Sequence, residues 1–336
     1  MENLREKKVV VTGGAGFIGS HLVERLLGEG YEVVALDNFD DYYSGKEANI
    51  SYLSSDKNFS LMRGDILNYE LLRSTVKGSQ LVFHLAAQPG ARFSLENPVK
   101  TNHVNTEGTL NVLRALVETR SCRLIFASSS SVYGAPLTTP VSESHPTMPT
   151  SIYGASKLAA EHYCMIYHKL RAVDVVCLRY HSVYGPRQRP DMAIYKWSKA
   201  ILTGQPPVIY GDGAQTRDFT YVDDIVEGTF LAAQCPEASG SVFNLGAGGS
   251  LSVKNALAMV QQALGKIVVR INHEPVRTEE PAATHADISK AREVLGYKPK
   301  MSFEEGLKLF AAWMIKHCEG IQNGSKPRGR SDHSTL

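Results

Sequence analysis

The segment VVVTGGAGFIGSHL, residues 9–22, decides the fold of this chain. Its apolar run reads as a buried strand, and Gly13, Gly16 and Gly19 separate that strand from a helical period. Glycines allow a tight turn and a close approach to the backbone, and the free N–H groups of a helix N-terminus attract phosphate. The segment therefore predicts the first βαβ unit of a dinucleotide-binding sheet.

An acidic residue ends the second strand-like run, YEVVALD. It is Asp37, 18 residues beyond Gly19. A carboxylate at this place would hydrogen-bond the ribose hydroxyls of an adenosine and repel a 2′-phosphate, which favours NAD over NADP. The alternative is a structural turn with a solvated aspartate.

Strand-like and helical segments alternate through the first half of the chain. This alternation predicts an α/β fold, a Rossmann-type doubly wound parallel sheet with a smaller C-terminal α/β substrate lobe. Ligands of such a sheet bind at the carboxyl ends of its strands. The strand-like runs cover 7–14, 31–38, 59–66, 79–87, 122–134 and 173–185, and the helical periods cover 19–30, 67–78, 105–120 and 151–170.

The alternation loosens after about residue 186. Residues 1–185 are expected to form the NAD-binding domain, to which later segments return, and residues 186–320 mainly the substrate-binding lobe. The polar segment 321–336 is expected to be a disordered tail. Helical periods in the second part cover 192–204, 221–234 and 253–264, and short strand-like pieces cover 207–211, 241–246 and 267–272.

Charge and cysteine usage exclude several classes of protein. In 336 residues, 36 basic and 34 acidic side chains give a formal net charge of +2, which provides no field for nucleic acid or an acidic membrane. The five cysteines are scattered without a CxxC pair, which argues against disulfides and a zinc site. No signal peptide or membrane span is evident. We therefore expect a cytoplasmic protein without a metal.

Further cofactor contacts are expected where the strands end. Asp65 would reach the adenine edge, or would only cap its own turn. The small side chains of HLAAQ, residues 84–88, permit close approach to a cofactor, although they also suit ordinary packing. The expected cofactor-binding residues are Gly13, Gly16, Phe17, Ile18, Gly19, Asp37, Asn38, Asp65, Ile66, Leu85, Ala86, Ala87, Gln88, Tyr153 and Lys157.

Tyr153 and Lys157 stand four residues apart in SIYGASK and share one face of the expected helix. A lysine ammonium beside a phenol favours the phenolate and lowers the tyrosine pKa, so Tyr153 can take a proton from a sugar hydroxyl. The alternative is a surface pair. The serines of FASSSSVYG, residues 126–134, would end the fifth strand and relay that proton, and alternation points only two of the four the same way.

Taken in order, several motifs resemble the extended short-chain dehydrogenase/reductase family, and within it the nucleotide-sugar epimerases and dehydratases. The resemblance runs from about residue 8 to 320. It implies tightly held NAD, a UDP- or dTDP-sugar substrate and usually a homodimer. It also implies Tyr153, Lys157 and Ser129 as catalytic residues. The motifs are TGGAGFIGSH, HLAAQ, SSSSVYG, YGASK, LRYHSVYGPR and GDGAQTRDFTYVDD.

The resemblance also indicates the reaction. The dehydratases place Asp-Glu directly after the catalytic hydroxyl residue, and the decarboxylases place a glutamate two residues before the VYG tyrosine. This chain has Ser130 and Ser131 at those positions. Without an added acid, the simplest chemistry is reversible hydride transfer at C4, in which the keto-sugar turns over and hydride returns to its other face.

Three segments resemble UDP-glucuronate 4-epimerases more than UDP-glucose epimerases, namely DNFDDYY, AAQPGARFSLENP and GPRQRPDM. Ser182 stands where glucuronate epimerases typically have threonine and glucose epimerases asparagine. A fixed arginine would grip the C6 carboxylate, and we expect this to be Arg189, helped by Ser129 to Ser131. The alternative is that Arg189 pairs with Asp191 and shapes the loop.

The remaining candidates face the substrate. The resemblance implies a diphosphate-binding role for Arg217, with a surface pair to Asp218 as the alternative. Arg277 and Asp287 fall in the segment that resembles the uridine side, and Arg92 lies in one of the glucuronate-like segments. His181 departs from the usual aromatic residue, and a structural role is expected. Two other functions stay open, a UDP-glucose or UDP-N-acetylglucosamine 4-epimerase, and a non-catalytic NAD-binding sensor or scaffold.

Overall fold

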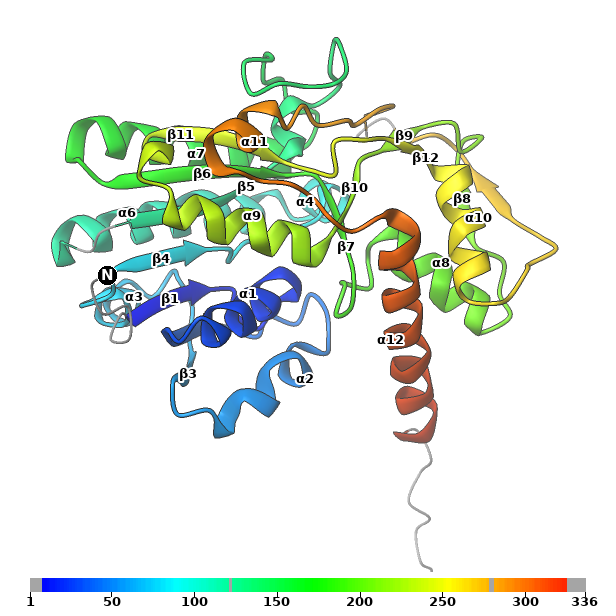
Figure 1. Cartoon of the computed structure of the whole chain (residues 1–336), viewed down its shortest axis with the longest axis horizontal. Coiled ribbons are helices and arrows are strands. Elements are labelled where there is room, and N and C mark those ends of the chain that lie inside the picture. The colour runs from blue at the N-terminus through cyan, green and yellow to red at the C-terminus, as the bar shows by residue number, and fades with distance from the viewer. Residues whose placement is uncertain (1–7, 121–122, 278–280, 325–336) are drawn as a thin grey trace, which may run out of the picture.

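A seven-stranded parallel sheet forms the centre of the computed structural model, which describes residues 8–120, 123–277 and 281–324 (Figure 1). The strand order is β11-β6-β5-β4-β1-β2-β3. Because the chain runs outward in opposite directions from β1 and β4, the expected Rossmann-type doubly wound fold is confirmed. The strands are β1 (Lys8–Thr12), β2 (Glu32–Asp37), β3 (Phe59–Arg63), β4 (Leu81–His84), β5 (Arg123–Ser129), β6 (Asp174–Tyr180) and β11 (Ser241–Leu245).

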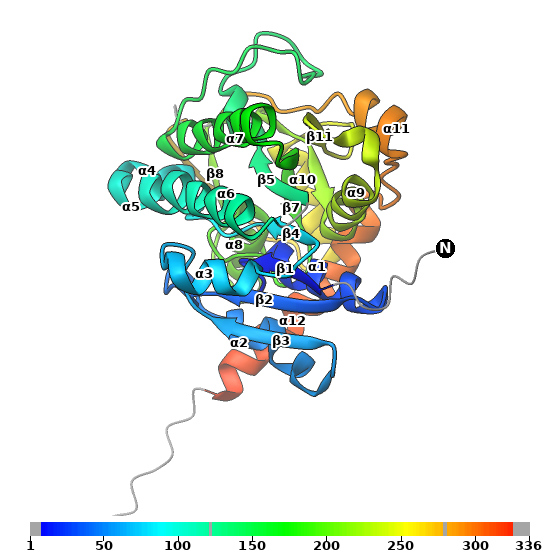
Figure 2. The same cartoon turned by 90° about the vertical axis from the view of Figure 1, so that its left-hand side faces the viewer.

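Helices cover both faces of this sheet (Figure 2). Val9 and Val11 of β1 point into the core under α1 and α9, whereas Val10 points into the core under α3, α6 and α7. All three valines are fully buried, which is why the strand is a continuous apolar run. The covering helices are α1 (Phe17–Gly28), α3 (Tyr69–Val76), α6 (Gly108–Thr119), α7 (Ile152–Arg171), α9 (Val222–Gln234) and α11 (Ser289–Leu295).

Short helical segments fill the connections at the carboxyl ends of the strands. Pro98 opens one of them at a position where its missing N–H costs nothing. A π-helical turn, η3 (His103–Glu107), leads into α6, and such turns often occur at functional sites. The others are α2 (Lys46–Ile50), η2 (Ser51–Ser55), α4 (Ala91–Glu96), α5 (Pro98–Asn102), η4 (Ser130–Tyr133) and η5 (Pro236–Ala238).

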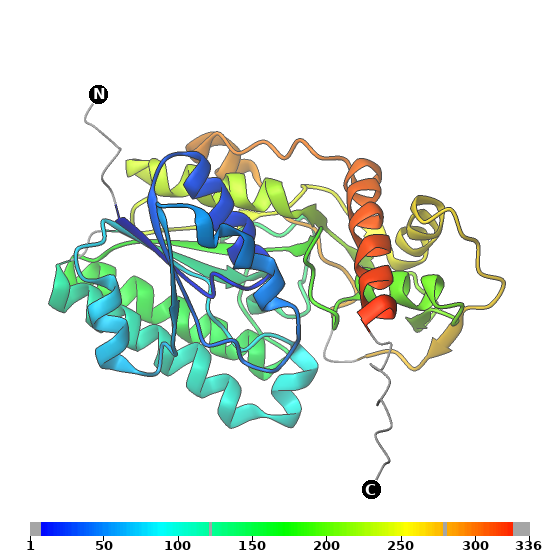
Figure 3. The same ribbon diagram turned by 90° about the horizontal axis from the view of Figure 1, so that it is seen from below.

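A second lobe stands beside the carboxyl ends of the strands. Its helix α12 packs against α8 and α10, and Figure 3 shows α12 in red alongside them. Both α9 and β11 come from the second part of the chain, yet α9 packs on the main sheet and β11 is one of its edge strands. The lobe contains β7 (Ser182–Tyr184), α8 (Ala193–Leu202), β8 (Val208–Tyr210), β9 (Thr216–Arg217), β10 (Phe219–Tyr221), β12 (Leu251–Ser252), α10 (Val253–Ala263), β13 (Asn272–Glu274) and α12 (Phe303–Gly324).

Three sequence expectations about the elements were wrong in detail. The sixth strand-like run divides at His181, because β6 pairs with β5 and β11 whereas β7 pairs with β10. The piece 267–272 is not a strand before Asn272, since Ile267 and Val269 are 90% and 105% exposed and have no surface to pack on. Helix α12 continues to Gly324, so the tail cannot begin at 321, and residues 325–336 lie outside the described chain.

Some global properties can be stated for the described residues. No described helix combines the length and apolar character needed to cross a membrane. Among these residues, no group of three or more His, Cys, Asp or Glu side chains could hold a metal ion. Cys122 lies outside the described residues, and the described cysteines are the free thiols Cys164, Cys177, Cys235 and Cys318.

Candidate active site

The main cavity lies at the carboxyl ends of the sheet strands. All fifteen cofactor-binding residues expected from the sequence line it, from Gly13 to Lys157. They come from the ends of β1, β2, β3 and β4 and from α1 and α7. Gly13 and Lys157 are 144 positions apart in the sequence, and the fold brings both of them to the wall of the same cavity. Other lining residues, among them Tyr42, Tyr43, Lys46 and Val104, were not expected.

The glycine turn between β1 and α1 is closed tightly at two positions. Gly13 has a φ of +70°, and a Cβ there would lie 2.7 Å from the Ala86 backbone nitrogen. A Cβ on Gly19 would collide with the Gly13 carbonyl oxygen. The Gly13 N–H donates to the Leu36 carbonyl at 2.7 Å, which ties the turn to β2. Only glycine at both places lets helix α1 begin directly against the strand ends.

Asp37 is buried at the end of β2. Its carboxylate accepts hydrogen bonds from the Ala15 N–H at 3.1 Å and the Phe39 N–H at 2.9 Å. Burial raises the pKa of Asp37, while these bonds and the nearby charge of Lys46 act in the opposite direction. Burial also lowers the pKa of Lys46. Because Asp37 is buried, the alternative of a structural turn with a solvated aspartate does not apply. Its cationic neighbour Lys46 could not be inferred from the spacing of residues in the sequence.

Asp65 caps its own turn and also stands at the cavity wall, while its contact with the adenine edge stays a prediction. It lines the cavity and accepts a hydrogen bond from the Asn38 side-chain amide at 2.8 Å. Its other oxygen accepts the Leu67 N–H at 2.9 Å and so also holds the local turn. The capping function and a position at the cavity wall are compatible here.

The end of β4 is held by a buried asparagine. Asn105, in the π-helical turn, accepts the Gln88 N–H at 2.7 Å and donates to the Gln88 carbonyl at 3.1 Å. It also donates to Ser156 Oγ at 2.9 Å, and Ser156 bonds the carbonyl of Tyr153. The cavity wall and the first turn of α7 are thereby joined. One signal in the sequence could have indicated Asn105, namely that it is a polar residue on the inward face of a helical period.

Lys157 is buried and Tyr153 is partly buried on the same face of α7, and both line the cavity, so they are not a surface pair. Ser151 caps the helix by accepting the Gly154 N–H at 3.0 Å, and the Tyr153 N–H donates to Ser94 Oγ at 3.0 Å. These bonds fix the start of the helix. Lys157 Nζ stands 4.3 Å from the centre of the Phe126 ring.

The expectation that Lys157 lowers the tyrosine pKa needs correction. Burial raises the pKa of Tyr153, and the opposing influences are the charge of Arg189 and a hydrogen bond with Ser129. Burial lowers the pKa of Lys157 itself to about 8. The groups that favour the Tyr153 phenolate in this structure are therefore Arg189 and Ser129.

The four serines have three different surroundings. Ser128 Oγ donates to Glu161 Oε2 at 2.7 Å and so points along the sheet into a buried network. Ser129 Oγ accepts the Ser131 N–H at 3.1 Å and lies 3.1 Å from Ser131 Oγ. Of these serines, Ser129 is the one that bonds Tyr153. Ser130 and Ser131 instead line a smaller adjoining cavity.

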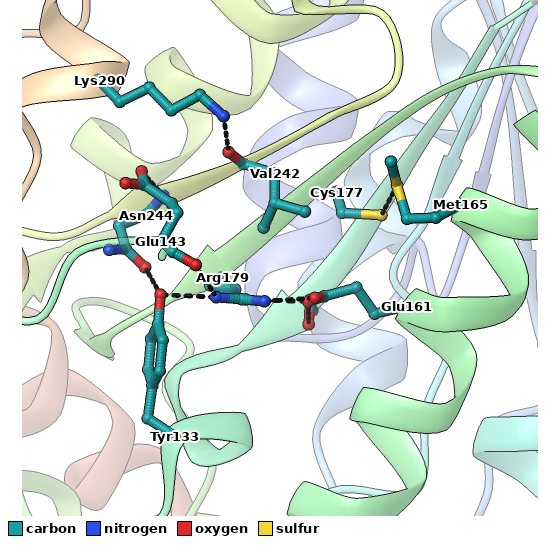
Figure 4. A network of polar contacts seen from close by, with 10 residues as sticks. Tyr133, Glu143, Glu161, Met165, Cys177, Arg179, Val242, Asn244 and Lys290 are labelled. Carbon is teal, nitrogen blue, oxygen red and sulfur yellow. Dashed lines mark hydrogen bonds and ion pairs between the residues drawn. The ribbon is translucent and has the colours of Figure 1, made fainter. Parts of the chain in front are cut away.

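The network that Ser128 enters is drawn in Figure 4. Arg179 of β6 pairs with Glu161 of α7, with Nη2 and Oε1 2.5 Å apart. The same guanidinium donates to the Tyr133 hydroxyl at 2.8 Å, which in turn donates to Asn244 Oδ1 at 2.8 Å. Residues of β5, β6, β11 and α7 are thereby fixed beneath the serine turn. Sequence analysis missed Arg179 and Glu161, because their pairing joins segments distant in the chain.

The two arginines of GPRQRPDM point to different places. Arg187, with a φ of +66°, pairs with Glu24 and donates to the Asn49 carbonyl at 3.3 Å, so it anchors the loop to α1 and α2. Arg189 lines the main cavity. It also forms the pair that the alternative predicted, with Nε and Nη2 at 2.9 and 3.0 Å from the two Asp191 oxygens. The two interpretations of Arg189 are therefore compatible.

A second cavity lies between β7, α8 and β8 of the second lobe. Ser182, Asp191, Arg217 and Arg277 all line it, and Ser182 and Arg217 also line the smaller cavity that contains Ser130 and Ser131. Arg277 stands with its guanidinium carbon 3.5 Å from the centre of the Tyr210 ring. The neighbour expected for Arg217, Asp218, is instead fully buried and accepts backbone N–H groups of Ala247 and Ala286.

The structure does not bring two expected substrate residues to these cavities. Arg92 is 68% exposed and pairs with Glu96 one turn along α4, because its helix turns this side chain to solvent. Asp287 accepts the Ser289 N–H at 2.9 Å at the start of α11. His181 is buried near Asp218, and burial lowers its pKa. Both of its ring nitrogens are buried without a hydrogen-bond partner among the described residues, and the structural role expected for it stays a prediction.

Comparison with known proteins agrees with this geometry. Residues 10–310 match the family model described as GDP-mannose 4,6 dehydratase. A UDP-glucuronate 4-epimerase of Thermodesulfobacterium geofontis is 37% identical over 319 residues, covering 94% of this chain and 98% of that protein.

Solved structures are similar over nearly the whole chain. A mutant UDP-glucuronic acid 4-epimerase from Bacillus cereus, in complex with UDP-4-deoxy-4-fluoro-glucuronic acid and NAD, has a TM-score of 0.89 and 39% identity. The match covers 92% of this chain and 99% of that one. A UDP-glucose 4-epimerase from Thermotoga maritima has a TM-score of 0.86 and 32% identity, over 93% and 99%. The similarity extends over nearly the whole chain, and this chain belongs to the extended short-chain dehydrogenase/reductase family of nucleotide-sugar epimerases and dehydratases.

Proposed function

We propose that this chain is an NAD-dependent 4-epimerase that interconverts UDP-glucuronate and UDP-galacturonate. One observation carries the proposal. The guanidinium of Arg189 reaches the cavity that Tyr153 and Lys157 line, and its charge acts on the Tyr153 phenol. A cation at the reacting centre suits a sugar with a carboxylate. The similarity to UDP-glucuronate 4-epimerases supports the same choice.

The main cavity fits NAD. A side chain at Gly13 or Gly19 would collide with the backbone of Ala86 or Gly13 and distort the turn at the cavity wall. Helix α1 begins after Gly16 without a side-chain cap, which leaves its first N–H groups for a pyrophosphate. The buried carboxylate of Asp37 suits a ribose diol. A bound NAD would supply a hydride acceptor and donor for C4 of the sugar, and the reaction would have no net redox change.

The chain's own residues would handle the proton and the charge. Tyr153 would take the proton of the 4-hydroxyl as the C4–H bond breaks, and return it to the oxygen after hydride arrives on the other face. Ser129 would hydrogen-bond the same oxygen, because it already bonds Tyr153. Lys157, on the next turn of α7, would bind the cofactor in the same cavity.

Substrate binding would use both lobes. Arg217 would hold the diphosphate, and Arg277 with the Tyr210 ring would bound the uridine side of the second cavity. Ser130, Ser131 and Ser182 would hydrogen-bond the sugar, since they line the small cavity between these sites. Arg189 would hold the carboxylate. That grip would also restrain the 4-keto intermediate, a β-keto acid, from the geometry in which its C–C bond breaks and CO₂ leaves.

We further propose a homodimer in the cytoplasm. Leu95 of α4 and Val99 of α5 are 50% and 81% exposed, and Leu170 of α7 is 69% exposed. Helices α4 and α5 both pack against α7, so the three helices that carry these apolar side chains adjoin one another. A second copy would cover them. Sedimentation velocity of the purified protein should give a dimer, and substitution of Val99 and Leu170 by aspartate should shift it to monomer.

The function is tested by product analysis. The purified protein is incubated separately with UDP-glucuronate and UDP-glucose, and the sugars are resolved by NMR, with Tyr153→Phe as the control. UDP-galacturonate from the first and little change in the second would support the proposal. UDP-galactose from the second alone would make the protein a neutral-sugar epimerase. Bound NAD without turnover of any UDP-sugar would favour a non-catalytic sensor.

A further inference from the structure

The guanidinium of Arg189 is held by a second carboxylate of the same loop. Asp191 accepts two hydrogen bonds from it, at 2.9 and 3.0 Å, and one from the Tyr42 hydroxyl at 3.1 Å. The side chains of Arg189 and Asp191 are 22% and 30% exposed. Burial alone would raise the pKa of Asp191, but Arg189 and Tyr42 hold it below its usual value. Asp191 is therefore ionised at neutral pH.

This pair stands between two cavities. Arg189 and Tyr42 line the main cavity, whereas Asp191 and its neighbour Met192 line the second cavity. A sugar that reaches from the second cavity to Tyr153 must pass the pair. Its carboxylate and that of Asp191 would then meet the same cation.

The geometry of the guanidinium lets two carboxylates use it. Arginine has five N–H groups in a fixed plane. The bonds to Asp191 use Nε and Nη2, one edge of that plane. Nη1 and the second hydrogen of Nη2 form another edge that these two bonds do not use. A substrate carboxylate can approach there, or can take the edge that Asp191 holds if Asp191 moves aside.

Epimerisation makes exchange at this cation necessary. Hydride leaves one face of C4 and returns to the other, so the keto-sugar must turn within the site, and the carboxylate attached to its ring must move as well. A partly buried guanidinium left without a counter-charge at that moment would oppose the turn. Asp191 is the nearest group that can supply the charge.

We infer that Asp191 is a positioning residue that exchanges with the substrate carboxylate for Arg189, and so lets the gripped uronate release and turn between the two hydride transfers. The inference rests on the proposed function. It differs from a merely structural role for Asp191, because it requires opposite effects on substrate binding and on turnover. It also confines both effects to sugars that carry a carboxylate.

The test compares Asp191→Asn with the wild type on UDP-glucuronate, with UDP binding as the reference that lacks a sugar carboxylate. The amide cannot neutralise Arg189, so the substrate carboxylate should be held more tightly. We expect KM for UDP-glucuronate and Ki for UDP-galacturonate to fall about three- to tenfold, and kcat to fall by a similar factor. The Kd of UDP should not change.

Tyr42→Phe provides a second variant with the opposite expectation. Loss of its hydroxyl removes one donor from Asp191 and leaves the carboxylate a stronger competitor for Arg189. KM for UDP-glucuronate should rise about two- to threefold, which is opposite in sign to the change expected for Asp191→Asn. This variant keeps the test decisive if Asp191→Asn proves unstable.

The outcomes separate the inference from the function. Conversion of UDP-glucuronate by the wild type, with KM and kcat both falling in Asp191→Asn, supports the exchange. Conversion by the wild type with an unchanged or raised KM in Asp191→Asn overturns the exchange and leaves the proposed function intact. A wild type that never converts UDP-glucuronate overturns the proposed function, and the inference with it.

Discussion

Replacing Arg189 by methionine should remove affinity for the uronate while leaving affinity for UDP. Methionine keeps much of the length of the side chain but cannot donate hydrogen bonds to a carboxylate. It also leaves the Asp191 carboxylate without the cation that now neutralises it. A substrate carboxylate would then approach a like charge instead of a guanidinium, so binding of UDP-glucuronate should weaken.

The size of the effect follows from the environment of the pair. Hydrogen bonds to charged groups contribute about 1.5–3 kcal/mol each when well made. The Arg189 side chain is 22% exposed, so solvent screens part of this contribution. A net loss of about 2–3 kcal/mol corresponds to a ~30- to 150-fold rise in the Kd of UDP-glucuronate, at about 1.4 kcal/mol for each factor of ten.

Calorimetric titration with UDP-glucuronate and UDP measures this directly, on protein saturated with NAD. The matched control is Arg187→Met, which removes the same charge two residues away. Arg187 pairs with Glu24 and donates to the Asn49 carbonyl. Its loss should therefore lower the stability of the protein without changing the ratio of the affinities for UDP-glucuronate and UDP.

Two results would refute this interpretation. Equal losses of UDP and UDP-glucuronate affinity in Arg189→Met would mean that the residue only shapes the loop. A specific loss of uronate affinity in Arg187→Met would mean that the wrong arginine of the segment has been assigned to the carboxylate.

Three further predictions concern the framework. Gly19→Ala should weaken NAD binding by at least about tenfold, because its Cβ would collide with the Gly13 carbonyl oxygen. The control Gly28→Ala should leave NAD binding unchanged, because a Cβ at that position meets nothing within 4 Å. Both affinities are measured by calorimetry on NAD-free protein. Glu161→Gln should lower the free energy of unfolding by about 3 kcal/mol, seen in urea denaturation, because it leaves the Arg179 charge buried without its partner. Burial lowers the pKa of His84 from 6.5 to about 3. As the pH falls from 6.5 towards 3, the unfolded chain therefore binds a proton at His84 that the folded chain does not bind. The free energy of unfolding should drop by about 1.4 kcal/mol per pH unit over this range. His84→Asn should remove that part of the slope, and a slope equal to the wild type's would contradict the assignment.

Much of the cofactor site could be predicted because its residues follow from local pattern. The glycine turn, Asp37 and the small residues after β4 each lie at a strand end, and strand ends of a parallel sheet share one edge. Helical spacing was enough to place Tyr153 and Lys157 on one face. All of these residues line the same cavity in the structure.

The features that could not be predicted depend on contacts between distant segments. Lys46 reaches Asp37 from a short helix with no strong period, and Asn105 acts through a π-helical turn. The Arg179–Glu161 pair joins β6 to α7, and no pattern within either element shows it. Arg92 was misplaced for the same reason, since only the direction of α4 turns it to solvent.

The central claim is that hydride leaves C4 of UDP-glucuronate and returns to the same carbon from the other side. It is tested by incubating the wild type with UDP-glucuronate that carries deuterium at C4, and then examining the product by NMR and mass spectrometry. The account predicts UDP-galacturonate that keeps its deuterium at C4. Product with solvent hydrogen at C4 would contradict it, because inversion would then proceed by proton exchange rather than by internal hydride return.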